Sequence, residues 1–94
     1  MFYIRRVSGN SMLPALKEGY TLLAVKFPGY NVGDIVIANV NGLEVVKRIA
    51  KVVEGKYKLV GDNSKYSTDS REWGLLSKKA LKGKVIYKYK HKQK

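Results

Sequence analysis

The chain has 94 residues, 45% of them hydrophobic, with 19 Lys and Arg against 7 Asp and Glu and a formal net charge of +12. This length supports one domain over residues 1–94 with a single core, and the hydrophobic content argues against a disordered chain. The absence of Cys excludes disulfides and thiolate chemistry. No apolar run approaches the roughly 18 residues that span a bilayer. As written, we expect a soluble, cytoplasmic protein, or one peripheral at a membrane surface.

Short runs of β-branched and aromatic residues between turn signals predict an all-β domain, built as a small coiled sheet or barrel. Asn41-Gly42 lies between two of these runs and is typical of a two-residue hairpin, and Glu54-Gly55 predicts a further turn. In chain order, the expected strands are Phe2–Val7, Tyr20–Lys26, Asp34–Val40, Leu43–Val53, Lys56–Val60 and Lys84–Lys90.

Two short helical pieces are expected beside these strands. One covers Pro14–Lys17. The other covers Lys78–Lys82, with Ser77 as its cap and Gly83 as its terminator.

The positive charge gathers toward the C-terminus, where no acidic residue follows Glu72 and a basic end begins at about residue 84. Such a bias attracts polyanions such as nucleic acid or anionic lipid, and it is equally typical of a solvated strand face with a basic tail. With seven Tyr in the chain, a basic β-domain that binds nucleic acid without being an enzyme stays open as an alternative.

The residue types exclude several catalytic chemistries. His91 is the sole His and lies in the terminal tail, so a Ser–His–Asp triad lacks a positioned imidazole. With no Cys and one His we expect no metal site, and the dispersed glycines form no phosphate-binding loop. A nucleophile in this chain therefore needs a Lys or a carboxylate as its base, and no cofactor is expected.

The stretch GNSMLP, residues 9–14, is a candidate nucleophile turn. Gly9 frees the backbone and Pro14 restrains it just beyond Ser11. Such a turn can project the Ser11 hydroxyl and leave backbone N–H groups free to bind an oxyanion. A Ser at this place is equally typical of a helix cap.

The stretch LEVVKRIAKVV supplies the candidate base. With a period of two, Leu43, Val45, Lys47 and Ile49 share one strand face. Loss of solvation would lower the pKa of Lys47, and a change from about 10.4 to 7–8 requires roughly 3–5 kcal/mol. The alternative is that Lys47 snorkels, with its stem on apolar surface and its amine in water.

Four stretches, SGNSMLP, GDIVIANV, VVKRI and GDNSKYSTDSREWG, occur in an order that resembles the type I signal peptidase family. Members of this family are serine–lysine endopeptidases with a coiled all-β core. The resemblance covers about Val7 to Val85, and its last block is highly specific. The short length and the STDSR stretch are most similar to the nickel-type superoxide dismutase maturation proteases. LexA-type self-cleaving proteins share the Ser–Lys pair and the core fold but lack the last block.

This resemblance implies a role for each matching residue. Ser11 would be the nucleophile and Lys47 the general base. Ser67 would orient the Lys47 amine, and Asp69 and Arg71 would form a supporting ion pair beneath the site.

Gly61, Asp62 and Asn63 would shape the loop that carries Ser67. The Ser11 N–H would be one oxyanion donor. The second is open, because Gly9 stands where some members have a donor Ser, which leaves Ser8 and Asn10 as further candidates.

The resemblance also implies a partner, namely a polypeptide substrate whose N-terminal leader or propeptide is removed after a small residue. No specific nucleic-acid partner and no cofactor are implied, and contact with an anionic membrane stays open. Signal peptidases usually carry an N-terminal membrane anchor, whereas this sequence starts ten residues before Ser11.

Overall fold

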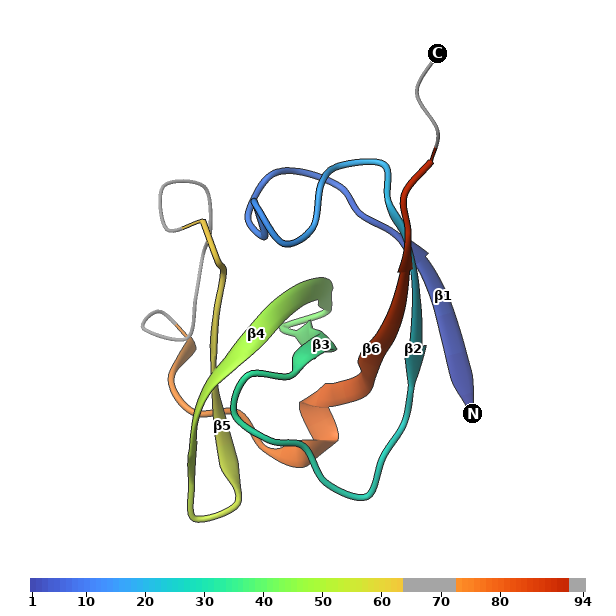
Figure 1. Ribbon diagram of the computed structural model, residues 1–94. Coiled ribbons are helices and arrows are strands. Elements are labelled where there is room, and N and C mark those ends of the chain that lie inside the picture. Colours follow the sequence, from blue (N-terminus) through green and yellow to red (C-terminus); the bar gives the residue numbers. More distant parts are fainter. Residues whose placement is uncertain (64–72, 92–94) are drawn as a thin grey trace.

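The computed structural model describes residues 1–63 and 73–91 (Figure 1). Its strands form one antiparallel sheet in the order β1-β2-β6-β3-β4-β5. The all-β class is therefore confirmed. The strands are β1 (Phe2–Arg6), β2 (Thr21–Val25), β3 (Ile35–Val40), β4 (Leu43–Val53), β5 (Lys56–Val60) and β6 (Leu81–Tyr89).

The bounds of β4 and β5 agree with the sequence-based prediction, and β1, β2 and β3 are slightly shorter than expected. The largest difference is in β6, which begins at Leu81 instead of Lys84. Leu81 pairs with Ala38 and is buried, so pairing with β3 extends the strand backwards. Gly83 lies inside this strand, where a Cβ would meet the Val25 backbone at 3.1 Å, so the position needs a glycine for close packing instead of for helix termination.

The two expected helical pieces are only partly correct. Residues 14 and 15 lie in a turn and residue 16 in a bend, and no helix forms over residues 14–17. The second piece is a short 3₁₀ helix, η2 (Lys78–Ala80), which ends where β6 begins. Ser77 precedes it but makes no side-chain capping hydrogen bond. The pairing of Leu81 with β3 takes priority over another helical turn.

Both predicted hairpin turns are present. Asn41 and Gly42 connect β3 to β4 with φ values of 53° and 82°, and Glu54 and Gly55 connect β4 to β5 with φ values of 49° and 76°. Positive φ at both central residues matches the right-handed twist of the flanking strands.

The last strand joins the two halves of the sheet. β6 pairs with β3 at its start and with β2 along the rest of its length. Register shifts interrupt the pairing of β6 with both neighbours and of β4 with β5. Such bulges bend strands and increase twist. The sheet coils as a result, and an ion pair between Arg5 on β1 and Glu44 on β4 links strands that are far apart in the strand order.

Two hydrophobic clusters pack against the coiled sheet, and β3 contributes buried side chains to the larger one. That cluster contains Tyr30, Val36, Ala38, Val40, Ile49, Tyr57, Leu59 and Leu81. The smaller cluster lies beneath the connection from β1 to β2 and contains Val7, Met12, Leu16 and Leu22. Within the described ranges, no helix is long and apolar enough to cross a membrane.

Candidate active site

The loop that carries Ser11 arches over one end of the sheet between β1 and β2 (Figure 1). Its base is closed by backbone hydrogen bonds, 2.8 Å from the Val7 N–H to the Tyr20 carbonyl and 2.9 Å from the Gly19 N–H to the Val7 carbonyl. Met12, the residue after Ser11, is only 2% exposed and anchors the loop in the smaller cluster. Ser11 is therefore held on a fixed turn.

Asn63, which follows β5, ties this loop to the other half of the molecule. Its backbone N–H donates to the Ser11 carbonyl at 2.8 Å, and its side-chain amide donates to the Asn10 carbonyl at 3.2 Å. Two bonds to adjacent carbonyls fix the backbone on both sides of the Ser11 N–H. Asn63 was expected to shape the loop of Ser67, and the structure gives it direct contact with the Ser11 turn.

Lys47 lies in the middle of β4, opposite Val36 of β3. It is 4% exposed and is the only polar or charged residue that is buried in the described part of the chain. The snorkelling alternative requires an amine in bulk water, and this burial is inconsistent with it. Of the expected apolar neighbours on its face, Ile49 is buried and Val45 packs against the larger cluster, whereas Leu43 is exposed.

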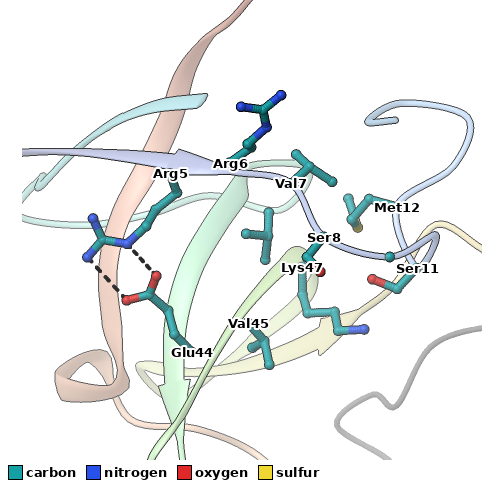
Figure 2. A pocket seen from close by; sticks show the side chains of 11 residues that line it. Arg5, Arg6, Val7, Ser8, Ser11, Met12, Glu44, Val45 and Lys47 are labelled. Carbon is teal, nitrogen blue, oxygen red and sulfur yellow. Dashed lines mark hydrogen bonds and ion pairs between the residues drawn. The ribbon is translucent and has the colours of Figure 1, made fainter. Parts of the chain in front are cut away.

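Ser11 and Lys47 meet in two adjoining cavities of about 210 and 300 Å³. Both residues line both cavities. Figure 2 shows the Lys47 side chain running from β4 toward Ser11, with its amine and the Ser11 hydroxyl directed toward one another. The structure thus brings together the two residues that are 36 positions apart in the sequence.

The cavity walls come from two strand segments and one aromatic residue. Residues 5–8, at the end of β1, form one wall, and residues 44–47 of β4 form the other. Trp73 lines the larger cavity and also packs against the larger hydrophobic cluster. Sequence reasoning used Trp73 only as part of a motif. Its position five residues before η2 carried no signal that it lines a cavity with Ser11.

The two strand segments that form these walls also present unpaired edges. In the described part of the chain, β1 pairs only with β2, and residues 43–47 of β4 pair only with β3. The pairing of β4 with β5 starts at Arg48. Unpaired strand edges expose backbone N–H and C=O groups that an added extended chain can use.

A charged cluster lies at the end of the smaller cavity away from Ser11. Both Glu44 carboxylate oxygens accept hydrogen bonds from the Arg5 guanidinium, and the Lys82 amine donates to Glu44 at 3.0 Å (Figure 2 shows the Arg5 pair). The hydrogen bond from Arg5, followed by the weaker contribution of Lys82, lowers the pKa of Glu44. The same hydrogen bond raises the pKa of Arg5.

Arg48, next to Lys47, makes a second ion pair that the sequence analysis did not predict. It donates two hydrogen bonds of 2.8 Å to the two carboxylate oxygens of Asp62 and one of 2.8 Å to the Gly33 carbonyl. The hydrogen bonds to Asp62 raise the pKa of Arg48. This contact ties Asp62 to β4. The next residue in the chain, Asn63, contacts the Ser11 turn.

The remaining predicted site residues have different outcomes. Ser67, Asp69 and Arg71 lie outside the described residues, so their expected roles stay predictions. Gly61 is partly buried and continues from β5 toward Asn63. Ser8, Gly9 and Asn10, the candidates for a second oxyanion donor, all line the larger cavity.

Among residues 1–63 and 73–91, Glu44 is the only acidic residue that lines these cavities, and His91 does not line them. His91 is exposed, lies 2.8 Å from the Thr21 hydroxyl and contacts the Tyr89 ring edge-on. Among residues 1–63 and 73–91, no three His, Cys, Asp or Glu side chains gather in a group that could hold a metal ion.

A family model described as Peptidase S24-like matches residues 1–86. The match covers most of the chain, so the chain belongs to the Peptidase S24-like family. The match supports the resemblance to the signal peptidases that the sequence motifs indicated, and it points to a serine-peptidase-like function. No curated protein matches the chain. The finer resemblance to the nickel-type superoxide dismutase maturation proteases stays a prediction.

Proposed function

We propose that this chain is a serine endopeptidase in which Ser11 is the nucleophile and Lys47 the general base, and that it removes an N-terminal leader or propeptide from a protein substrate. The observation that carries the proposal is the burial of Lys47 at 4% exposure, with its amine directed at a hydroxyl in a shared cavity (Figure 2). Membership in a peptidase family supports the same function.

Burial prepares the amine for this role. Removing an ammonium group from water disfavours its charged form, so a buried Lys is more readily neutral near neutral pH. A neutral Lys47 can accept the Ser11 proton as the hydroxyl attacks the scissile carbonyl. The resulting Lys47 ammonium then protonates the leaving amine of the substrate. Lys47, neutral again, activates a water that hydrolyses the acyl-enzyme.

The Ser11 turn supplies the electrostatic part of the mechanism. The Ser11 N–H is the first oxyanion donor, and the second comes from Gly9 or Asn10, which both line the larger cavity. Gly9 has a φ of 81°, a conformation that a side chain would strain. The two hydrogen bonds from Asn63 hold this turn in place, and we assign Ser67, Asp69 and Arg71 to the support of the Lys47 amine and its loop.

The substrate binds as an extended strand. The unpaired edges of β1 and of residues 43–47 of β4 form opposite walls of the smaller cavity, so a peptide between them can hydrogen-bond to either backbone. Val7, Met12 and Val46 line the smaller cavity. From the resemblance to the signal peptidases, we expect cleavage after a small residue such as Ala, with a second small residue two positions upstream.

The test is cleavage of a leader-peptide library, read by mass spectrometry, with wild type, Ser11→Ala and Lys47→Ala. Lys51→Ala is the matched control, because Lys51 lies on the same strand and is exposed. We expect wild type and Lys51→Ala to cut after small residues and the two site variants to be inactive. Cleavage by Ser11→Ala or Lys47→Ala at the wild-type rate would overturn the proposal.

The pH profile tests the role of the base separately. If Lys47 must be neutral, the cleavage rate rises with pH as the amine loses its proton. A rate that is flat between about pH 6 and 9 would contradict the assignment of Lys47, because that range brackets the pKa expected of a catalytic lysine.

A further inference from the structure

The charged cluster at the end of the smaller cavity is not used by the proposed reaction. It consists of Arg5 on β1, Glu44 on β4 and Lys82 on β6, and both cations donate hydrogen bonds to the Glu44 carboxylate. Both also lie over the Tyr3 ring, Arg5 at 5.6 Å and Lys82 at 5.1 Å from its centroid. The Arg5–Glu44 pair joins β1 to β4 beside the cavity that Ser11 and Lys47 line (Figure 2).

The cluster carries a surplus of positive charge, because two cations share one carboxylate. Among the described residues, the ion pairs of Arg5 and Lys82 are both with Glu44. Arg6 lines the same cavity and forms no ion pair within residues 1–63 and 73–91. This end of the cavity therefore attracts an anionic group and repels a cationic one.

The two cations also keep hydrogen-bond donors for a further anion. The Arg5 guanidinium directs its Nε–H and one Nη2–H at Glu44 and one Nη1–H at the Ile4 carbonyl, so in the described part of the chain each Nη atom retains a second N–H. Lys82 directs one of its N–H groups at Glu44. The side chains of Arg5, Glu44 and Lys82 are 36%, 32% and 30% exposed, so a bound chain can reach them.

The spacing along β4 assigns the cluster to one position of the substrate. Glu44 precedes Lys47 by three residues, which is about 10 Å of extended strand. A peptide whose upstream residues lie in the smaller cavity has the residue before the cleaved bond beside Lys47. Its fourth residue before that bond, three positions further upstream, then lies beside Glu44.

The alternation of side chains along the strand agrees with this assignment. Val45 and Lys47 share one face of β4, and Glu44 lies on the other. In an extended substrate the first and third residues before the cleaved bond, both expected to be small, share one face, and the fourth residue points to the opposite face. A charged fourth residue therefore does not compete with the small residues for the same space.

We propose that the charged cluster selects substrates that carry Asp or Glu as the fourth residue before the cleaved bond. The inference rests on the proposed function, because it assumes that a peptide lies in the cavity. The substrate carboxylate accepts hydrogen bonds from the remaining N–H groups of Arg5 and Lys82, and Lys82 supplies the surplus charge. A substrate Lys or Arg is disfavoured at this position, because Glu44 already accepts from two cations.

The test uses a leader peptide that wild type cleaves, with Glu, Gln or Lys placed in turn at each position from the sixth before the cleaved bond to the fourth after it. Mass spectrometry measures kcat/KM for each peptide. At the fourth position before the bond we expect Glu to be cleaved about two- to fivefold faster than Gln, as for a partly exposed ion pair, and Lys more slowly than Gln. At the other positions the ratio of Glu to Gln should be near one.

Two variants should move this ratio in opposite directions. Lys82→Gln removes the surplus charge and keeps the Arg5–Glu44 pair, so the ratio of Glu to Gln should fall toward one. Glu44→Gln adds to the surplus, so the ratio should rise. Lys51→Gln is the control, because Lys51 is exposed on β4 and lines neither cavity. It removes the same charge from the chain and should keep the wild-type ratio. A purely structural role would change all peptides alike and leave the ratio unchanged.

Binding of the same peptides to Ser11→Ala, measured by fluorescence anisotropy, separates selection from chemistry. The inference alone is overturned if wild type cleaves the Glu and Gln peptides equally, if it prefers Glu only after the cleaved bond, or if Lys82→Gln and Lys51→Gln lower the ratio equally. If wild type cleaves no peptide and Ser11→Ala binds the Glu and Gln peptides equally, the proposed function and the inference both fail. If wild type cleaves no peptide but Ser11→Ala binds the Glu peptide more tightly and Lys82→Gln abolishes that difference, the peptidase assignment fails and the selection by the cluster stands.

Discussion

The two halves of β4 share one strand but differ in what lies beside them. Residues 43–47 pair only with β3 in the described part of the chain, and they line the cavities that contain Ser11. Residues 48–53 pair with β5, and Ile49 is part of the larger cluster. The transition falls between Lys47, which is buried and directed at Ser11, and Arg48, which is paired with Asp62.

This difference shows how one strand can carry a reactive group without losing its place in the core. The second half supplies pairing and apolar contacts that hold the strand. The first half is thereby free to keep an open edge and a buried amine, both of which cost stability. The following experiments test that division of roles, from the largest expected effect to the smallest.

Replacing the buried amine should separate activity from stability most clearly. For Lys47→Met we expect cleavage to fall by about 10²–10⁴, the usual contribution of a general base. The free energy of unfolding should stay the same or rise, because an apolar side chain of similar length removes a buried polar amine. Peptide cleavage and urea denaturation measure the two effects. A Lys47→Met protein that fails to fold would show that Lys47 is mainly structural.

Truncating a core side chain beside the second half of β4 should have the opposite outcome: stability should fall while activity per folded molecule is kept. Leu59 of β5 is fully buried opposite Ile49. Leu59→Ala should cost about 2–5 kcal/mol of unfolding free energy because it leaves a cavity. Below the unfolding transition, the cleavage rate per folded molecule should stay near that of wild type. Val52→Ala, at a position that is 39% exposed on β4, is the control and should change stability little.

Breaking the ion pair between Arg48 and Asp62, at the boundary between the two halves of β4, should have a smaller effect on both the cleavage rate and the free energy of unfolding. The Arg48 and Asp62 side chains are 33% and 17% exposed, so their ion pair is partly screened by water. Asp62→Asn should cost about 1 kcal/mol, between the values typical of exposed and of buried pairs. It should also slow cleavage modestly, because Asn63 holds the Ser11 turn. A double-mutant cycle with Arg48→Gln measures the pair, and additive effects would show that the two side chains are not coupled.

The smallest expected effect is that of acid on the ion pair between Arg5 of β1 and Glu44 in the first half of β4. Hydrogen bonds from Arg5 and then Lys82 lower the pKa of Glu44 in the folded state. The stabilisation is therefore complete above the ordinary Glu pKa of 4.5 and is lost as pH falls through the lowered value. Urea midpoints from about pH 6 down to pH 3 measure it. The difference in urea midpoint between wild type and Glu44→Gln should shrink in acid. A constant difference would show that the charge of Glu44 is not the source of the stabilisation.

The sequence by itself determined the all-β class, the strands β4 and β5 and both hairpin turns, because alternation and turn residues act over a few positions. It also indicated Ser11 and Lys47. Excluding the imidazole and the thiol left a Lys or a carboxylate as the base, and the resemblance to the signal peptidases selected Lys47. The chain-order motifs identified the signal-peptidase-like family, which the family match supports.

Local patterns were insufficient where long-range pairing decides the outcome. β6 starts at Leu81 because it pairs with β3, and residues 14–17 form no helix because Met12 and Leu16 pack in the smaller cluster. The contact of Arg48 with Asp62 and that of Asn63 with the Ser11 turn follow from where β5 ends relative to the β1–β2 loop. No spacing in the sequence encodes those positions.

Only the tertiary structure decided that Lys47 is buried and not snorkelling, and that its amine meets Ser11 in a cavity (Figure 2). The physical reason is that burial and direction belong to the coiled sheet as a whole. Its bulges bring the end of β1 opposite the first half of β4, and neither segment specifies that approach alone.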